Sequence, residues 1–147
     1  MFKHLFVPTD GSALSSDTVK KAVDFARETG ARLTFFYARP DYPVAFYGEG
    51  ALIDPTTPEK FADMAEKQAQ EILAAAQALA GAAGVPAAAT SATSDVPYQA
   101  IIDAAAASGC DLIFMASHGR RGLSGLLLGS ETQKVLTHSK IPVLVYR

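Results

Sequence analysis

The amino-acid sequence predicts an α/β domain built on a doubly wound, five-stranded parallel sheet. Short β-type runs alternate with stretches at helical spacing along the whole chain, in the order βαβαβαβαβ. Such an alternation, joined by right-handed crossovers, favours parallel strands covered by helices on both faces. Five strands of this kind commonly take the order 3-2-1-4-5, and the topological switch point then lies between the first and fourth strands.

Each expected element is bounded by residues suited to its ends. The expected strands span 5–7, 33–37, 86–92, 112–115 and 141–146, and the expected helices lie between residues 12 and 30, 58 and 82, 97 and 109, and 130 and 138. Ser12 can cap the first helix, Gly30 can end it, and Pro97 suits the first turn of the third. The strand at 86–92 is mostly alanine and threonine, which is typical of an edge position. The connection from about 39 to 58 contains four prolines and is long for a compact domain.

Composition and charge narrow the classes of function. The chain has 147 residues, 49% of them hydrophobic, which fits one globular domain over residues 1–147. The formal net charge of −2 offers no basic excess for a nucleic-acid backbone, and no apolar stretch reaches the roughly 20 residues that span a bilayer. A single cysteine, Cys110, cannot form an intramolecular disulfide, and no secretory signal pattern precedes the first strand. We expect a cytoplasmic protein that binds neither nucleic acid nor membrane.

Polar segments follow the two strands that flank the switch point. Residues 8–10 (Pro-Thr-Asp) follow the first strand, residues 116–119 (Ala-Ser-His-Gly) follow the fourth, and Gly129 and Ser130 open the last helix. Ligands of open α/β sheets bind at the carboxyl ends of the strands at this point. A glycine loop and a helix amino terminus offer backbone N–H groups to an anion. The pattern predicts a nucleotide site in which Asp10 contacts the ribose or base, while the loop and Ser130 hold the phosphates.

These residues resemble the nucleotide loop of the ATP-binding universal stress proteins. That loop reads glycine, two residues, glycine, nine residues, glycine, then serine or threonine, and here its first glycine is replaced by Ala116. The likeness covers essentially the whole chain, from residues 7–12 (Val-Pro-Thr-Asp-Gly-Ser) to residues 142–145 (Pro-Val-Leu-Val). It implies the adenine nucleotide alpha hydrolase-like fold. It also implies ATP or a related adenine nucleotide as ligand, with or without Mg²⁺, and a regulatory role in the stress response.

The resemblance implies a role for each residue of the site. Asp10 would meet the adenosine, Ala38 and Met115 would line the adenine pocket, and the loop with the amide of Glu131 would contact the phosphates. Thr132 is a further candidate by its position at the helix start. Taking the resemblance together with the strand ends and loop charges, we predict the contact residues Pro8, Thr9, Asp10, Ala38, Met115, Ala116, His118, Gly119, Arg120, Gly129, Ser130, Glu131 and Thr132.

Several of these residues also have structural roles open to them. Asp10 before Gly-Ser can form an Asx turn, and Ser130 with Gln133 fits a capping box. Both roles are compatible with a ligand contact, because a capping serine uses its side chain while a phosphate uses the amides. Arg120 and Arg121 are either a phosphate clamp or solvated loop charges.

Other positions leave further alternatives open. The methyl group of Ala116 matters only if that residue needs a positive φ or very close contact with the ligand. The Glu131 carboxylate complements the helix dipole, yet it would repel a phosphate if its side chain faced the same pocket. The His118 ring either faces the phosphate or is exposed or bonded to backbone. Tyr42 and the other aromatics of the 39–58 connection either cover the adenine or anchor that segment.

Three classes of function are consistent with the sequence. The leading class is a nucleotide-binding regulatory protein, and the alternatives are a slow ATP hydrolase and a ligand-free dimeric interaction module. The chain has no P-loop motif, and its histidines and single cysteine lack metal-ligand spacing, so we expect no catalytic residues and no metal site. The apolar terminal strand would be an exposed edge, which predicts a homodimer through residues 142–146.

Overall fold

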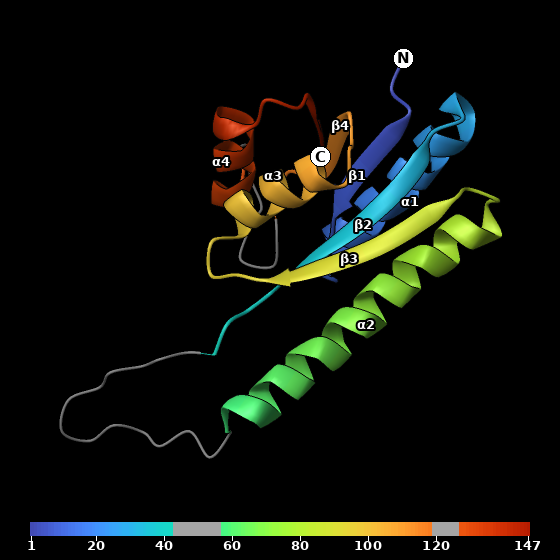
Figure 1. Ribbon diagram of the computed structural model, residues 1–147. Helices are drawn as coiled ribbons and strands as arrows, with labels where there is room; N and C mark the ends of the chain where they lie inside the picture. Colours follow the sequence, from blue (N-terminus) through green and yellow to red (C-terminus); the bar gives the residue numbers. More distant parts are fainter. Residues whose placement is uncertain (43–56, 119–126) are drawn as a thin grey trace.

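The computed structural model describes residues 1–42, 57–118 and 127–147. The nine elements in these ranges alternate as predicted, and their strands form one parallel sheet in the order β3-β2-β1-β4-β5 (Figure 1). The strands are β1 His4–Pro8, β2 Arg32–Arg39, β3 Ala87–Thr93, β4 Leu112–Ala116 and β5 Val143–Tyr146, and the helices are α1 Ala13–Thr29, α2 Pro58–Ala82, α3 Pro97–Ala107 and α4 Ser130–His138. The predicted fold class is confirmed, with β3 at one edge of the sheet and β5 at the other.

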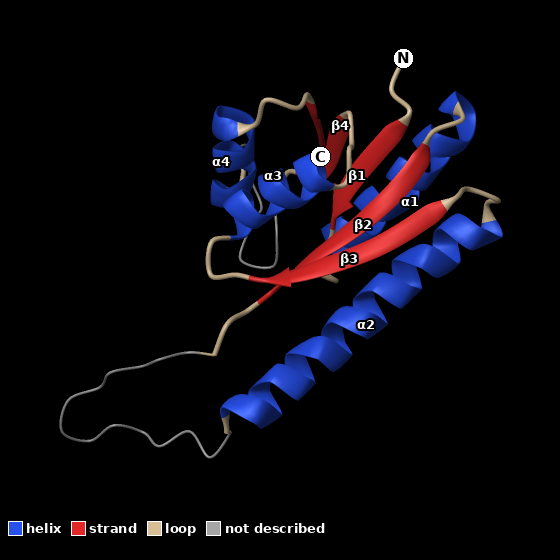
Figure 2. Cartoon of the chain, viewed as in Figure 1, coloured by secondary structure: helices blue, strands red, loops and turns tan. Residues whose placement is uncertain are grey.

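Two helices cover each face of the sheet (Figure 2), and a hydrophobic cluster of buried side chains lies under each pair. Side chains of a strand point alternately to its two faces. Leu5 and Val7 of β1 therefore join the cluster under α1 and α2, whereas Phe6 joins the cluster under α3 and α4. On β4, Phe114 belongs to the first cluster and Met115 to the second. Both faces of the central strands are buried, which explains why their sequences are almost wholly apolar.

The helix ends follow the predicted capping residues. The Ser12 hydroxyl accepts a hydrogen bond from the Ser15 amide at 3.2 Å, and Gly30 ends α1 in the left-handed region with φ 72°. Pro58 and Pro97 occupy the first turns of α2 and α3, where the missing N–H costs nothing. Among the described helices, even α2 with its 25 residues lacks the apolar run that a bilayer crossing requires.

All five strands differ from their predicted bounds by one or two residues at one end or both, and two of these differences have a clear local reason. β2 continues to Arg39 because that residue still pairs with Thr93 of β3. β5 begins at Val143 rather than at Ile141, since the Ile141 amide donates to the Ser139 hydroxyl at 3.0 Å and so closes a turn before the strand. The hydrophobic run alone does not reveal such a turn.

Candidate functional site

The carboxyl ends of β1 and β4 lie side by side, as the predicted topology requires. The two strands pair in parallel, with Phe6 opposite Ile113. On the other side of β1, the Thr9 amide donates to the Phe36 carbonyl at 2.8 Å and holds the start of the following turn against β2. The segments after β1 and β4 therefore meet at one edge of the sheet, the edge at which open α/β sheets bind ligands.

Asp10 shapes the turn that leads from β1 into α1. Its Oδ1 accepts a hydrogen bond from the Ser12 amide at 2.9 Å, and this is the predicted Asx turn. The Asp10 amide donates to the Ser15 hydroxyl at 3.1 Å, and Ser15 in turn donates to Thr9 Oγ1 at 2.7 Å. Gly11 has φ 77°, a conformation that favours glycine. Ser15, which the sequence does not single out as part of the site, is therefore the side chain that ties this turn to the helix.

Ala116 is the last residue of β4 and pairs with Tyr146 of β5. The strand pleat places its methyl group on the same face as Phe114, and its carbonyl accepts a hydrogen bond from Thr132 Oγ1 at 2.9 Å. No residue other than glycine has a positive φ in the described ranges, so Ala116 does not need the conformational freedom of glycine. Ala116 therefore has no need of a positive φ, and its methyl group could matter only through very close contact with a ligand.

The residues on either side of positions 119–126 hydrogen-bond to one another. The Gly129 amide donates to the Ser117 carbonyl at 2.8 Å. One ring nitrogen of His118 hydrogen-bonds to the Ser117 hydroxyl at 2.9 Å, and the other bonds to the Leu127 carbonyl. The structure thus shows the backbone-bonded alternative for the His118 ring. Gly119, Arg120 and Arg121 lie outside the described residues, so their predicted phosphate contacts stay predictions.

α4 begins at the predicted residue, Ser130, but its N-cap differs from the predicted capping box. Gly129 is its N-cap, because the Gly129 carbonyl accepts the first helical hydrogen bond from the Gln133 amide at 3.0 Å. Ser130 is then the first residue inside the helix, and the Gln133 side chain donates to the Leu128 carbonyl at 2.8 Å instead of reaching back to it. The capping box is wrong for this reason. No side chain among the described residues caps α4, in contrast to α1 and α2.

The next two residues of α4 turn their side chains in different directions. Thr132 is buried, with 3% of its surface exposed, and bonds to the end of β4. Glu131 reaches α3 instead, where one carboxylate oxygen accepts from the Tyr98 amide at 2.8 Å. Its other oxygen lies 3.4 Å from the Lys134 ammonium. These two side chains hold the first turn of α4 against both the sheet and α3. In the described chain, no side chain caps the main-chain amides of this turn.

The predicted adenine-pocket residues lie near this edge on one face of the sheet. Met115 is buried in the cluster under α3 and α4, and half-buried Ala38 near the end of β2 packs against the same cluster. Pro8 ends β1 opposite Phe36. These positions agree with the predicted arrangement, although a contact with adenine stays a prediction.

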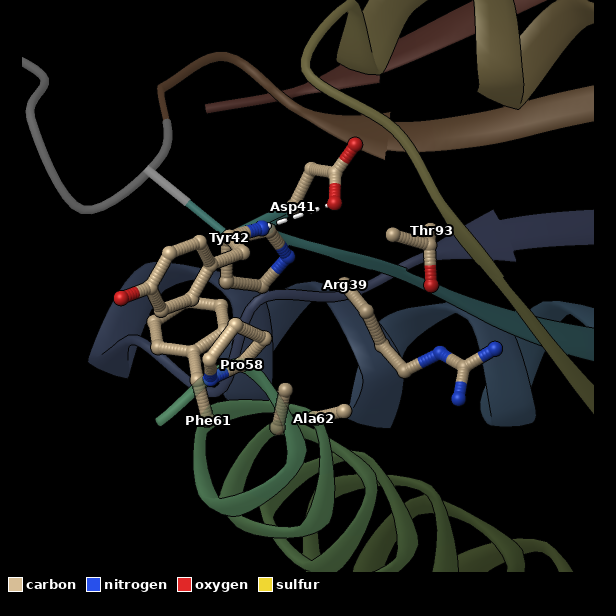
Figure 3. Close-up of a pocket in the computed structure, with 9 residues that line it drawn as sticks. Arg39, Asp41, Tyr42, Pro58, Phe61, Ala62 and Thr93 are labelled. Atoms are coloured by element: carbon tan, nitrogen blue, oxygen red, sulfur yellow. Dashed lines mark hydrogen bonds between the residues drawn. The ribbon is translucent and has the colours of Figure 1, made fainter. Parts of the chain in front are cut away.

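A cavity of about 220 Å³ lies at the same edge of the sheet but on the β3 side, away from the switch point, between the end of β2 and the start of α2 (Figure 3). Tyr42 packs against Phe61 there with the two rings nearly perpendicular and their centres 5.6 Å apart. Arg39 and Thr93 lie on its opposite side, and Arg39 forms an ion pair with Glu66. The cavity is smaller than most small-molecule sites and contains none of the predicted contact residues. Tyr42 therefore anchors its segment to α2, one of its two predicted alternatives.

The clearest pKa shifts are found at the opposite, amino-terminal edge of the sheet. Burial and then the nearby Arg32 charge lower the pKa of His4, and burial raises the pKa of the Cys110 thiol to about 11. Burial alone would raise the pKa of Asp111, but hydrogen bonds from the Lys3 and His4 amides outweigh it and lower that pKa. These groups are structural, and such a thiol is unreactive. Within the described ranges, no three His, Cys, Asp or Glu side chains are grouped as a metal site requires.

The strand order and parallel pairing give this chain the adenine nucleotide alpha hydrolase-like fold, and the comparison with known proteins adds the family. The chain belongs to the universal stress protein family, whose model matches residues 1–147. It is 30% identical to universal stress protein MJ0531 of Methanocaldococcus jannaschii, a match that covers 100% of this chain and 83% of the relative. It is 31% identical to universal stress protein YxiE of Bacillus subtilis, and both chains are covered completely.

Solved structures agree with the fold. The structure of MJ0577 superposes with a TM-score of 0.81 at 23% identity, covering 99% of this chain and 95% of that one. A universal stress protein in complex with cAMP gives a TM-score of 0.71 at 26% identity, covering 99% of this chain and 97% of that one. The Archaeoglobus fulgidus universal stress protein in complex with dAMP gives a TM-score of 0.68 at 17% identity, covering 100% of this chain and 98% of that one. Some members of the family thus hold adenine nucleotides.

Proposed function

We propose that this protein binds an adenine nucleotide, ATP or a close relative with or without Mg²⁺, and acts as a regulatory factor in the cytoplasmic stress response. The supporting observation is the meeting of two features at the switch point of the sheet. The Asp10 turn follows β1, and the amino terminus of α4, which no described side chain caps, faces the end of the neighbouring β4. We take residues 1–147 as one domain that carries this site.

Each half of the proposed site has a chemical role. The main-chain amides of Ser130, Glu131 and Thr132 lie in the first turn of α4, where unpaired N–H groups and the helix dipole favour an anion. Asp10 already accepts the Ser12 amide, and a carboxylate has acceptor capacity for further donors such as ribose hydroxyl groups. Related proteins in complex with cAMP and dAMP support an adenine nucleotide as the ligand class.

The first experiment is to denature freshly purified protein and identify any released small molecule by mass spectrometry. ATP is then titrated calorimetrically into the stripped protein. A co-purified adenine nucleotide, or saturable ATP binding, supports the proposal. An empty protein with no heat of binding contradicts it and favours the ligand-free interaction module, and multiple turnovers of ATP per minute with magnesium would favour the hydrolase.

The phosphate side of the site is tested with Gly129→Val. Gly129 has φ −60° and ψ 153°, which any residue adopts, so the new side chain obstructs the approach to α4 without straining the backbone. We expect loss of nucleotide binding with an unchanged circular dichroism spectrum. The matched control is Gly81→Val, because an added Cβ at Gly81 meets nothing within 4 Å and this position lies at the far end of α2. Unchanged affinity in Gly129→Val would refute the phosphate site.

We also propose that the protein forms a homodimer through residues 142–146. β5 pairs with β4 on one side and is the edge of the sheet on the other, and it carries Val143, Leu144, Val145 and Tyr146. Antiparallel pairing of two copies of this strand would satisfy their main-chain groups and close a two-fold interface. Light scattering of the purified protein tests this proposal. A monomer at micromolar concentration contradicts it.

A further inference from the structure

Glu131 places a negative charge in the first turn of the helix that would hold phosphate. It is the second residue of α4, between Ser130 and Thr132, neither of which is charged. The charge is fixed in position, since one carboxylate oxygen accepts the Tyr98 amide at 2.8 Å and the side chain is only 38% exposed.

The contact with Tyr98 gives Glu131 a structural reason to stay where it is. α3 starts at Pro97, and the side chain of its N-cap residue, Val96, makes no capping hydrogen bond in the described chain. The Glu131 carboxylate supplies that acceptor from a different helix and complements the amino-terminal dipole of α3. The carboxylate therefore stays beside the amino ends of α3 and α4 at once.

Lys134 compensates this charge only in part. Its ammonium lies 3.4 Å from Glu131, and its side chain is 50% exposed. Exposed ion pairs of this kind, three residues apart on a helix, are weak because solvent and salt screen them. The negative charge that Glu131 places beside the first turn of α4 is therefore not fully neutralised.

We propose that Glu131 sets the charge preference of the nucleotide site, so that adenine nucleotides with one phosphate bind more tightly than those with three. This inference rests on the proposed function. Each added phosphoryl group brings further negative charge, and repulsion by a fixed carboxylate grows with that charge. The amides of α4 can hold one phosphate directly, while the outer phosphates of ATP add charge near the same carboxylate.

The test is calorimetric titration of AMP, ADP and ATP into the stripped protein at low salt without divalent ions. We compare the wild type with Glu131→Gln, which keeps an oxygen for the Tyr98 amide but removes the charge. We expect the wild type to prefer AMP, and the substitution to raise the affinity for ATP relative to AMP by about three- to tenfold. The matched control is Glu59→Gln, which removes an acidic residue from the first turn of α2 and should leave the ratio unchanged.

Salt dependence gives a second readout that needs no variant. Repulsion between Glu131 and the phosphates is screened at high ionic strength, so the preference of the wild type for AMP should narrow between about 0.05 and 0.5 M salt. A wild type that prefers ATP, or a substitution that changes all three affinities by the same factor, overturns the role of Glu131 and leaves the nucleotide site standing. Absence of binding by all three nucleotides overturns the proposed function and this inference together.

Discussion

The hydrogen bond between Thr132 and Ala116 is one of the contacts that hold α4 on the end of β4, and its removal has a calculable cost. Thr132→Val keeps the shape of the side chain and removes only the hydroxyl donor, which lies 2.9 Å from the Ala116 carbonyl at a site where Thr132 is 3% exposed. A neutral hydrogen bond contributes about 0.5–1.5 kcal/mol, and a buried acceptor that loses a partner adds a desolvation cost. We expect the free energy of unfolding to fall by about 1–2 kcal/mol.

Urea unfolding followed by circular dichroism measures this change. We expect Thr132→Val to unfold at a lower urea midpoint, with an unchanged dependence of the free energy on urea concentration. The matched control is Thr137→Val on the same helix. The Thr137 hydroxyl donates to the Gln133 carbonyl at 2.8 Å, but it does so at an exposed position. Exposed substitutions of this kind stay within about 0.5 kcal/mol. Equal losses in the two variants, or no loss in Thr132→Val, would refute the reasoning.

Two further predictions concern stability. Gly81→Ala should raise the free energy of unfolding by about 0.5–1 kcal/mol, because Gly81 lies in α2 and an added Cβ there meets nothing. Gly84→Ala should lower the free energy of unfolding by about 1 kcal/mol. An added Cβ at Gly84 also has open space, but Gly84 has φ 70°, a conformation that favours glycine. Thermal unfolding that shows the same sign for both contradicts this prediction. Because the pKa of buried His4 is lowered in the folded protein, the His4 side chain of the unfolded chain binds a proton more readily. The contribution of neutral His4 to the free energy of unfolding is therefore complete above about pH 6.5 and is lost as the pH falls below that value. Between pH 7.5 and pH 5.5, the urea midpoint should fall less in His4→Gln than in the wild type. His138→Gln is the control at an exposed position and should behave as the wild type does. If the midpoint changes with pH by the same amount in all three proteins, this role for His4 is excluded.

The elements of the fold were predictable because each has a strong local signal. α2 begins and ends at the predicted residues, since Pro58 suits a first turn and the following residues are good helix formers with one apolar face. The edge position of β3 followed from its alanine and threonine content, and the observed sheet order confirms it. The Asp10 turn was equally local, because the carboxylate and the Ser12 amide that it accepts are two residues apart.

The N-cap of α4 shows where local reasoning fails. Both Gly129 and Ser130 are good N-cap residues, and the choice between them depends on which carbonyl accepts the first helical bond. That choice follows the contacts of the helix with the rest of the protein, where Thr132 bonds to β4 and the Gly129 amide bonds to Ser117. The spacing of Ser130 and Gln133 fits a capping box, but the N-cap lies one residue earlier, at Gly129.

The sequence by itself determined the order of the elements, the family resemblance and the two segments that meet at the switch point, because these depend on periodicity and on turn residues close together in the chain. Only the tertiary structure decided that the His118 ring bonds to Ser117 and Leu127, and that Glu131 caps α3 at Tyr98, 33 residues away. Such partners are chosen by how helices pack on the sheet, and packing brings together donors and acceptors whose separation along the chain carries no signal.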